Sequence, residues 1–155
     1  MEAFAMPNDQ SIPDRRVVMM LCAEATRPEL ERALKQVRYN GEVQDVRRPE
    51  TGLVMARGRI GGEGKPFNFG EATVTRATVR IASGQMGFSY HLGRDVERAR
   101  AAAILDALWQ SPDLSPEVER ALAPVRARIE TEQASERQRV EATRVNFFTM
   151  VRGED

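Results

Sequence analysis

A glycine-rich stretch near the middle of the chain contains the residue types that bind anions. Residues 61–70 include four glycines, Lys65 and Pro66. Glycine lets backbone N–H groups converge on an anion and lysine adds positive charge, so the stretch suggests a phosphate or phosphonate site made by Gly61, Gly62, Gly64 and Lys65. The P-loop pattern of nucleotide-binding proteins fails, because Arg59 and Pro66 replace its first glycine and its Ser or Thr. A connection that needs glycine only for its shape remains the alternative.

Two arginines extend this hypothesis onto the segment that follows. Arg76 and Arg80 lie in the run 72–81, which is rich in Thr and Val and therefore typical of a β-strand. Because side chains alternate along a strand, both arginines would point to one face, roughly 13 Å apart. There they would meet phosphates or an acidic partner surface, or they would be solvated arginines on an outer face. The sequence leaves both interpretations open.

Cysteine and histidine each occur once, as Cys22 and His91. One cysteine excludes disulfide frameworks, four-cysteine zinc sites and iron–sulfur clusters held by this chain alone, and one histidine excludes a multi-histidine metal site. We expect Cys22 to be a buried structural thiol and His91 to be a partly buried histidine at the end of a strand. The spacing of the other residues singles out no nucleophile–base pair or carboxylate dyad. We therefore predict no catalytic residue and no metal ligand.

The elements that must position these residues predict an α+β fold, with an antiparallel four-stranded meander sheet packed by helices. The strands are expected at Val43–Arg47, Leu53–Ile60, Thr73–Ala82 and Met86–Leu92. The second of them has apolar residues on both faces, as in a strand that is covered on both sides. A turn at 49–52 would precede it, and Ser83-Gly84 would join the last two strands. Residues 61–70 are expected to form neither helix nor strand.

Helix signals flank the predicted sheet. Residues 15–25 and 29–37 each present an apolar face, and Thr26 and Glu29 between them have the capping-box spacing. The second of these helices would end at Asn40-Gly41. Asp95 is well suited to cap a third helix that runs to Gln110. Ser115-Pro116 would begin a fourth helix, which Pro124 would break or kink.

The composition changes towards the C-terminus. Residues 130–139 offer almost no apolar face, and a helix that is polar all round does not pack on its own domain. A dense apolar run follows at 145–151. We therefore predict an α+β core domain at 1–110 and a C-terminal helical arm at 111–155, which would dock on another subunit through Phe147, Phe148, Met150 and Val151. The alternative is that this tail folds back onto its own sheet.

The overall composition argues against several classes of protein. The 155 residues carry 23 basic and 23 acidic side chains, and a nucleic-acid-binding protein would normally carry a basic excess. No apolar stretch approaches the length of a transmembrane helix, and the first ten residues lack the pattern of a secretory signal. We therefore expect a cytoplasmic protein with neither a nucleic acid nor a membrane as its partner.

Several blocks of the sequence resemble the G subunit of the bacterial carbon–phosphorus lyase core complex, which degrades phosphonates. They are ETGLV at 50–54, RIGGEGKPFNFGEATVTRATVRI at 59–81, GFSYHLGRD at 87–95, ILDAL at 104–108 and ATRVNFFTMVRG at 142–153. The blocks run in the family's order and cover most of the chain after Glu50. The N-terminal helices match only in character, and no catalytic residue is carried over from the family.

The resemblance implies an accessory subunit of a transferase complex. In this family the G subunit assembles with H, I and J subunits and works with a subunit of the ATP-binding-cassette type. The complex supports attack of a phosphonate on C1 of the ribose of ATP, which releases adenine and forms α-D-ribose 1-methylphosphonate 5-triphosphate. ATP would thus be a substrate of the complex, and this chain would bind no cofactor. The J subunit would cleave the C–P bond with S-adenosylmethionine and an iron–sulfur cluster.

Two other functions remain open. The chain could be a pure interaction module that fixes the geometry of its partners without touching substrate. Alternatively, it could be an independent enzyme that binds phosphorylated small molecules through the glycine-rich loop. That second alternative needs catalytic groups that the sequence does not show.

Overall fold

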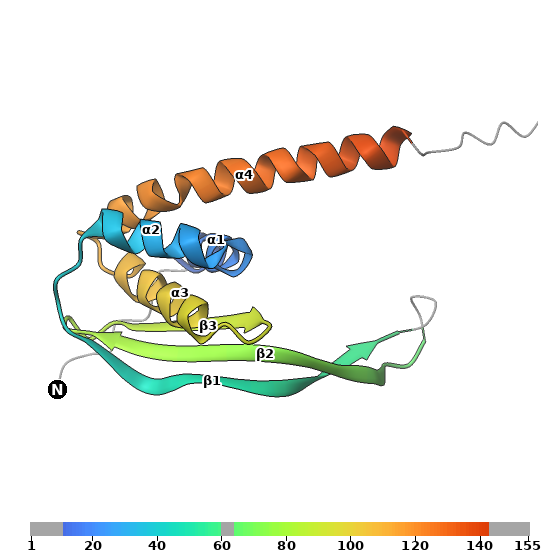
Figure 1. The fold of residues 1–155 in the computed structure, drawn as a ribbon, viewed down its shortest axis with the longest axis horizontal. Helices are drawn as coiled ribbons and strands as arrows, with labels where there is room; N and C mark the ends of the chain where they lie inside the picture. Colours follow the sequence, from blue (N-terminus) through green and yellow to red (C-terminus); the bar gives the residue numbers. More distant parts are fainter. Residues whose placement is uncertain (1–10, 60–63, 143–155) are drawn as a thin grey trace, which may run out of the picture.

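The computed structural model describes residues 11–59 and 64–142, and Figure 1 shows their arrangement. The helices are α1 (Ser11–Glu24), α2 (Arg27–Val37), α3 (Val96–Trp109) and α4 (Ser115–Ala142), and the strands are β1 (Val43–Gly58), β2 (Phe67–Ile81) and β3 (Met86–Leu92). The strands form one antiparallel sheet in the order β1-β2-β3. α3 lies directly on one face of this sheet, and α1, α2 and α4 lie beyond α3 (Figure 1).

The α+β class agrees with the prediction, but the four-stranded sheet was wrong. Within the described residues the sheet has three strands, because β1 runs without a turn through both of the first two predicted strands. Pro49, which suggested a turn, lies in an edge strand within the register shift between Arg47 and Glu50, and a further shift between Asp45 and Arg47 precedes it. Proline lacks an N–H group and is tolerated at an edge or a bulge, where no ladder hydrogen bond is lost.

The end of the glycine-rich stretch also differs from the prediction. β2 begins at Phe67, and Gly70 pairs with Ala56 of β1. The prediction that 61–70 contains no strand was therefore wrong for its last residues. A register shift between Ala56 and Arg57 accommodates the irregularity there.

α3 forms the centre of the hydrophobic core. Its buried residues surround the helix, as expected for a helix enclosed between layers, and include Ala99, Ala102, Ala103, Leu105, Ala107 and Leu108. The small side chains let the helix approach β3 closely. At Gly87 of β3 an added Cβ would overlap the carbonyl oxygen of Ala103 and lie 2.6 Å from the Ala107 nitrogen.

The predicted helix caps are present. The Glu29 carboxylate accepts hydrogen bonds from the Thr26 N–H at 2.7 Å and from the Thr26 hydroxyl at 2.9 Å, and the Asp95 carboxylate accepts one from the Arg98 N–H at 2.9 Å. α2 ends earlier than Asn40-Gly41, because Arg38 adopts the left-handed conformation with φ 52°.

The two halves of α4 have different surroundings. α4 continues through Pro124 as one helix instead of ending there. Its first half contributes Val118, Leu122, Val125 and Ile129 to the core, whereas residues 130–141 are exposed. The division into a 1–110 domain and a 111–155 arm stays a prediction, since the predicted docking residues Phe147, Phe148, Met150 and Val151 lie outside the described residues.

The far halves of β1 and β2 project beyond the rest of the sheet (Figure 1). β3 pairs with β2 only as far as Val74↔Leu92, whereas β1 and β2 remain paired to Gly58↔Phe67. We call residues 51–58 of β1 and 67–73 of β2 the distal hairpin. Leu53 and Met55 in this hairpin are 62% and 52% exposed. The expectation of a strand covered on both faces was therefore wrong, because the described helices and β3 do not reach it.

None of the helices in the described ranges is both long and apolar enough to span a membrane.

Candidate functional site

The residues predicted to bind anions fall at two separate places. Gly61 and Gly62 lie outside the described residues, while Gly64 and Lys65 stand just before β2 at the tip of the distal hairpin. Arg76 lies nine residues beyond Phe67, the first residue of β2, a distance of about 30 Å in a strand, and Arg80 lies further still. Lys65 and the two arginines therefore cannot hold the same phosphate group within one chain.

Arg76 and Arg80 share the sheet face that points away from α3, as the alternation predicted. Both are exposed, whereas the intervening Ala77 and Val79 are buried under the helices. Arg76 is already partnered: its Nη2 lies 2.7 Å and its Nε 2.8 Å from Oε1 of Glu50. Arg47 also contacts this oxygen, at 3.3 Å. No ion pair joins Arg80 to another described residue.

Two shallow hollows adjoin these arginines. The first has a volume of about 200 Å³ and is lined by Glu50, Thr51, Gly52, Leu53, Val54, Val74, Arg76 and Tyr90. The second, about 180 Å³, is lined by Glu42, Gln44, Arg80, Ile81 and Ala82. A phosphate entering the first hollow would compete with Glu50 for the Arg76 guanidinium. This exchange would cost little, because exposed ion pairs contribute little stability.

Cys22 is buried, as the sequence indicated, and His91, which was expected to be partly buried, is buried as well. Cys22 is 3% exposed, and burial raises the pKa of its thiol to about 12, with a smaller contribution from the Asp106 charge. A thiol in that state is a poor nucleophile. His91 is 4% exposed, and its Nδ1 has no hydrogen-bond partner among the described residues. Burial is the main cause that lowers the pKa of His91 to about 4, and the nearby positive charge of Arg98 contributes to the same shift.

The low pKa of His91 predicts acid sensitivity. The folded protein keeps His91 neutral, while the unfolded chain binds a proton near pH 6.5, so stability is complete above that pH and decreases as the pH falls towards 4. Between pH 7 and pH 5 we expect a loss of about 2 kcal/mol from this group. Urea denaturation at both pH values measures the loss, and His91→Gln should remove most of it. An equal loss in His91→Gln would contradict the assignment.

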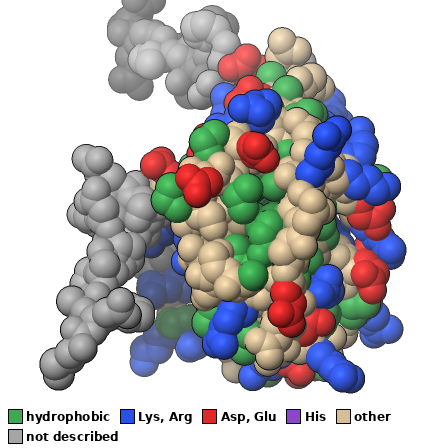
Figure 2. All heavy atoms as spheres, turned by 90° about the vertical axis from the view of Figure 1, so that its left-hand side faces the viewer, with side chains coloured by type: hydrophobic (Ala, Val, Ile, Leu, Met, Phe, Trp, Pro, Cys, Tyr) green, Lys and Arg blue, Asp and Glu red, His purple; other side chains and the backbone are tan. Residues whose placement is uncertain are grey.

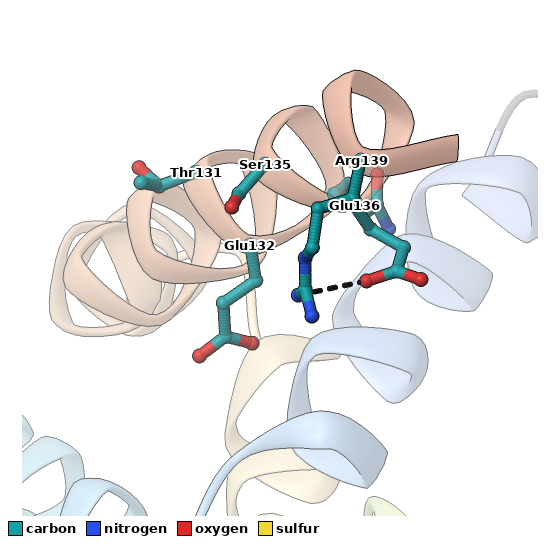
Figure 3. A pocket seen from close by; sticks show the side chains of 6 residues that line it. Thr131, Glu132, Ser135, Glu136 and Arg139 are labelled. Atoms are coloured by element: carbon teal, nitrogen blue, oxygen red, sulfur yellow. Dashed lines mark ion pairs between the residues drawn. The ribbon is translucent and has the colours of Figure 1, made fainter. Parts of the chain in front are cut away.

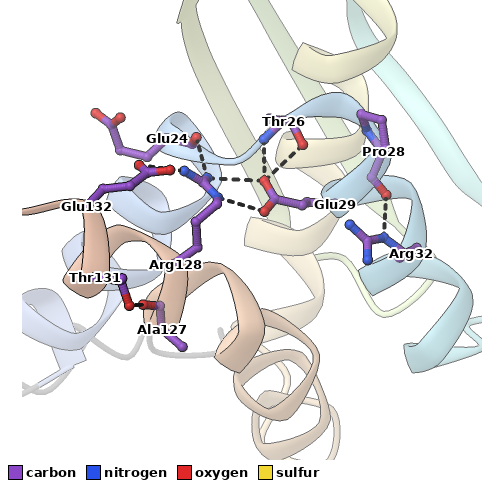
Figure 4. Close-up of polar contacts among 9 residues, drawn as sticks. All are labelled: Glu24, Thr26, Pro28, Glu29, Arg32, Ala127, Arg128, Thr131 and Glu132. Carbon is purple, nitrogen blue, oxygen red and sulfur yellow. Dashed lines mark hydrogen bonds and ion pairs between the residues drawn. The ribbon is translucent and has the colours of Figure 1, made fainter. Parts of the chain in front are cut away.

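Glu29 and Arg128 form a network that the sequence analysis missed. The Arg128 guanidinium contacts both Glu29 carboxylate oxygens, at 2.8 and 3.1 Å, and also Glu132 at 2.9 Å and the Glu24 carbonyl at 3.1 Å (Figure 4). The Arg128 contact is the main cause that lowers the pKa of Glu29 to about 2. The network fixes α4 to the α1–α2 junction at the point where α4 leaves the core. The sequence indicated only the capping role of Glu29. Its ion pair with Arg128 could not be predicted, because the two residues lie 99 positions apart and no local pattern connects them.

The second half of α4 presents a polar surface. A hollow of about 520 Å³ is lined by Thr131, Glu132, Gln133, Ser135, Glu136 and Arg139. Glu136 and Arg139 form an ion pair at 2.9 Å, and both side chains extend from the same side of the helix (Figure 3).

On the left-hand side of Figure 1, which faces the viewer in Figure 2, acidic and basic side chains are interspersed. This face therefore lacks a patch of one charge.

The described residues contain no group of three or more His, Cys, Asp or Glu side chains placed to hold a metal ion. The chemistry that they offer is that of guanidinium groups on an open sheet face, together with exposed apolar side chains on the distal hairpin. The first can bind anions and the second can bind protein.

Comparison with known proteins agrees with the resemblance seen in the sequence. The family model described as phosphonate metabolism protein PhnG matches residues 13–153. A relative from Rhizobium meliloti (strain 1021), named alpha-D-ribose 1-methylphosphonate 5-triphosphate synthase subunit PhnG, is 50% identical over 155 residues. The match covers 100% of this chain and 99% of the relative. The chain belongs to the PhnG family of phosphonate metabolism proteins.

Proposed function

We propose that this chain is an accessory subunit of an α-D-ribose 1-methylphosphonate 5-triphosphate synthase. The complex transfers the ribose 5-triphosphate moiety of ATP to a phosphonate and releases adenine. The observation that carries this proposal is the 50% identity to a relative of that name over essentially the full length of both chains. The projecting distal hairpin supports it, since large exposed apolar side chains suit a protein that works within an assembly.

The chain has the other subunits of the synthase as its partners. We assign these partners to the H, I and J types, together with a subunit of the ATP-binding-cassette type. The tail residues Phe147, Phe148, Met150 and Val151 are proposed to dock on one of them. ATP and the phosphonate are substrates of the complex, this chain holds no cofactor of its own, and the complex is cytoplasmic.

Reconstitution of the complex tests the function. Adenine release from ATP and methylphosphonate is measured for the complete complex, for the complex lacking this chain, and for this chain alone. We expect release only from the complete complex. Release by the chain alone would favour the independent enzyme, and full activity without the chain would overturn the proposal.

Arg76 and Arg80 are the residues that we propose to contact the triphosphate or the phosphonate, at a site completed by a neighbouring subunit. Guanidinium groups bind phosphate oxygens through two parallel hydrogen bonds, and these two arginines lie on one open face. Gly61, Gly62, Gly64 and Lys65 would contact a different anion, or a different subunit, from the tip of the hairpin.

Replacing both arginines with alanine is expected to raise the KM of the complex for ATP or for the phosphonate by about 100-fold or more, because each of the two charge-assisted contacts contributes roughly 1.5–3 kcal/mol. Steady-state adenine release measures the change. Glu50→Gln serves as the control, since it removes the ion pair with Arg76 and leaves both arginines in place. An unchanged KM in the double variant would mean that the arginines are solvated, and would favour the pure interaction module.

A further inference from the structure

The distal hairpin leaves large apolar side chains uncovered on both of its faces. Leu53 and Met55 are 62% and 52% exposed and share the face that α3 covers further along the sheet. Phe67 and Phe69 are 43% and 64% exposed, with ring centroids 6.3 Å apart. The Phe69 ring lies over Gly58, within 3.2 Å of the position that a Cβ would take. Because side chains alternate along a strand, a Cβ at Gly58 would lie on the face opposite to that of Leu53 and Met55. The Phe69 ring is therefore on that opposite face, and apolar surface is present on both sides of the hairpin.

The edges of the hairpin are equally open. β3 ends its pairing with β2 at Val74, so residues 67–73 have β1 as their only partner strand among the described residues. A ribbon of two strands is at best marginally stable in water, and stability requires a third strand or a packed face. The hairpin therefore has the form of an element that is completed by another surface.

The free edge of β1 is protected against pairing with a foreign strand in its first half but not in its second half. The first half contains Pro49, two register shifts and the charged residues Asp45 and Arg47, which are the features that prevent pairing with a foreign strand. From Thr51 to Ala56 the pairing with β2 is regular and no charged residue occurs. Only the projecting half of the edge is thus left available.

The charge at the tip indicates what kind of surface receives the hairpin. Arg57, Arg59 and Lys65 are exposed and make no ion pair with other described residues. A receiving surface with carboxylates at its rim would neutralise them. A second copy of this hairpin fits poorly, because two tips brought together would repel each other.

We infer that the distal hairpin inserts into an apolar cleft with an acidic rim on another subunit of the synthase, and that Leu53, Met55, Phe67 and Phe69 are its anchors. The inference rests on the proposed function. Two other binding partners of the hairpin can be distinguished from this one by experiment. One is a second copy of the chain, and the other is the chain's own segment 143–155. α4, which precedes that segment in the sequence, ends on the side to which the hairpin also projects (Figure 1).

Hydrogen exchange of the wild-type chain identifies the occupant. We expect the amides of 51–56 and 67–73 to exchange rapidly in the full chain alone and about 10-fold or more slowly in the complex with the co-expressed synthase subunits. Equal exchange in both states would overturn the inference. Protection already present in the chain alone would also overturn it, and would assign the surface to segment 143–155 if truncation after Ala142 removed the protection.

Substitution of the anchors tests the energetic role of the hairpin. Leu53→Ser combined with Phe69→Ser is expected to weaken the affinity for the other subunits by about 100-fold or more, because buried anchors dominate binding. The matched control is Met20→Ser with Val96→Ser, two residues of α1 and α3 that are 49% and 38% exposed. We expect the control to stay within about 3-fold of the wild type.

Light scattering and circular dichroism separate the remaining outcomes. A dimeric wild-type chain that the anchor substitutions turn into a monomer would assign the hairpin to a second copy and overturn the inference. Equal loss of affinity in the anchor and control variants would overturn it as well. A wild-type chain that joins no complex at all would instead overturn the proposed function. If circular dichroism shows that the anchor variant is unfolded, its loss of affinity is not interpreted. The inference is then tested by the hydrogen-exchange experiment on the wild-type chain alone.

Discussion

Replacing Gly87 with alanine is expected to destabilise the protein by about 3 kcal/mol or more, at the upper end of what overpacking costs. The added methyl group would overlap the carbonyl oxygen of Ala103 and lie 2.6 Å from the nitrogen and 2.9 Å from the Cβ of Ala107. Two of these three atoms belong to the backbone of α3, so no side-chain rotation can relieve the contact. β3 and α3 would have to move apart, at the centre of the core.

Gly70→Ala provides the matched control for Gly87→Ala. Both glycines lie within strands, but at Gly70 nothing stands within 4 Å of an added Cβ and φ is not positive. We expect its stability to stay within about 0.5 kcal/mol of the wild type, or to rise slightly as the unfolded chain loses freedom. Urea denaturation of both variants, followed by circular dichroism, measures the difference. Similar stabilities would show that α3 has room to move on the sheet.

Local signals in the sequence predicted the starts of α2, α3 and α4 well, whereas α1 begins at Ser11 and not at residue 15 as expected. Thr26 with Glu29, and Asp95 ahead of Arg98, act over three residues, and their hydrogen bonds are present as expected. The number of strands was less predictable. Pro49 indicates a turn when only its neighbours are considered, and its acceptance inside β1 depends on β1 being an edge strand.

The expectation for residues 53–60 was wrong for a related reason. Apolar residues on both faces of a strand are typical of burial within one domain, but they are also present where a strand is covered by a different protein. The sequence alone does not distinguish these cases. The arginines Arg76 and Arg80 share a face as alternation required, whereas the separation of Lys65 from them became evident only from the length of β2.

Asp106 is the second residue whose replacement should have a large effect, since it joins three elements. Its side chain is 1% exposed and accepts hydrogen bonds from Nε and Nη2 of Arg15 in α1, at 2.9 and 2.8 Å, and from the Phe88 N–H of β3 at 2.8 Å. The Arg15 guanidinium also lies 5.8 Å from the centroid of the Phe88 ring, as in a cation–π contact. α1 is thereby held against the edge of the sheet.

Asp106→Ala is expected to cost about 3–5 kcal/mol, because it leaves a half-buried guanidinium and a strand N–H without their acceptor. Arg15→Ala is expected to cost a similar amount, since the Asp106 carboxylate would then be buried without a countercharge. Denaturant midpoints of the single variants and of Arg15→Ala/Asp106→Ala form a double-mutant cycle. If the pair acts as a unit, the double variant loses clearly less than the sum of the two single losses.

The cycle also separates the role of the ion pair from that of the backbone hydrogen bond. Asp106→Asn keeps an oxygen that can accept from the Phe88 N–H but removes the negative charge, so its loss relative to the wild type reports on the ion pair. Its difference from Asp106→Ala reports on the Phe88 hydrogen bond. We expect Asp106→Asn to lie between the wild type and Asp106→Ala, because the Phe88 bond survives. If Asp106→Asn were as unstable as Asp106→Ala, the ion pair with Arg15 would account for the whole effect. In that case the attachment of α1 to the sheet edge would depend on electrostatics rather than on the strand hydrogen bond.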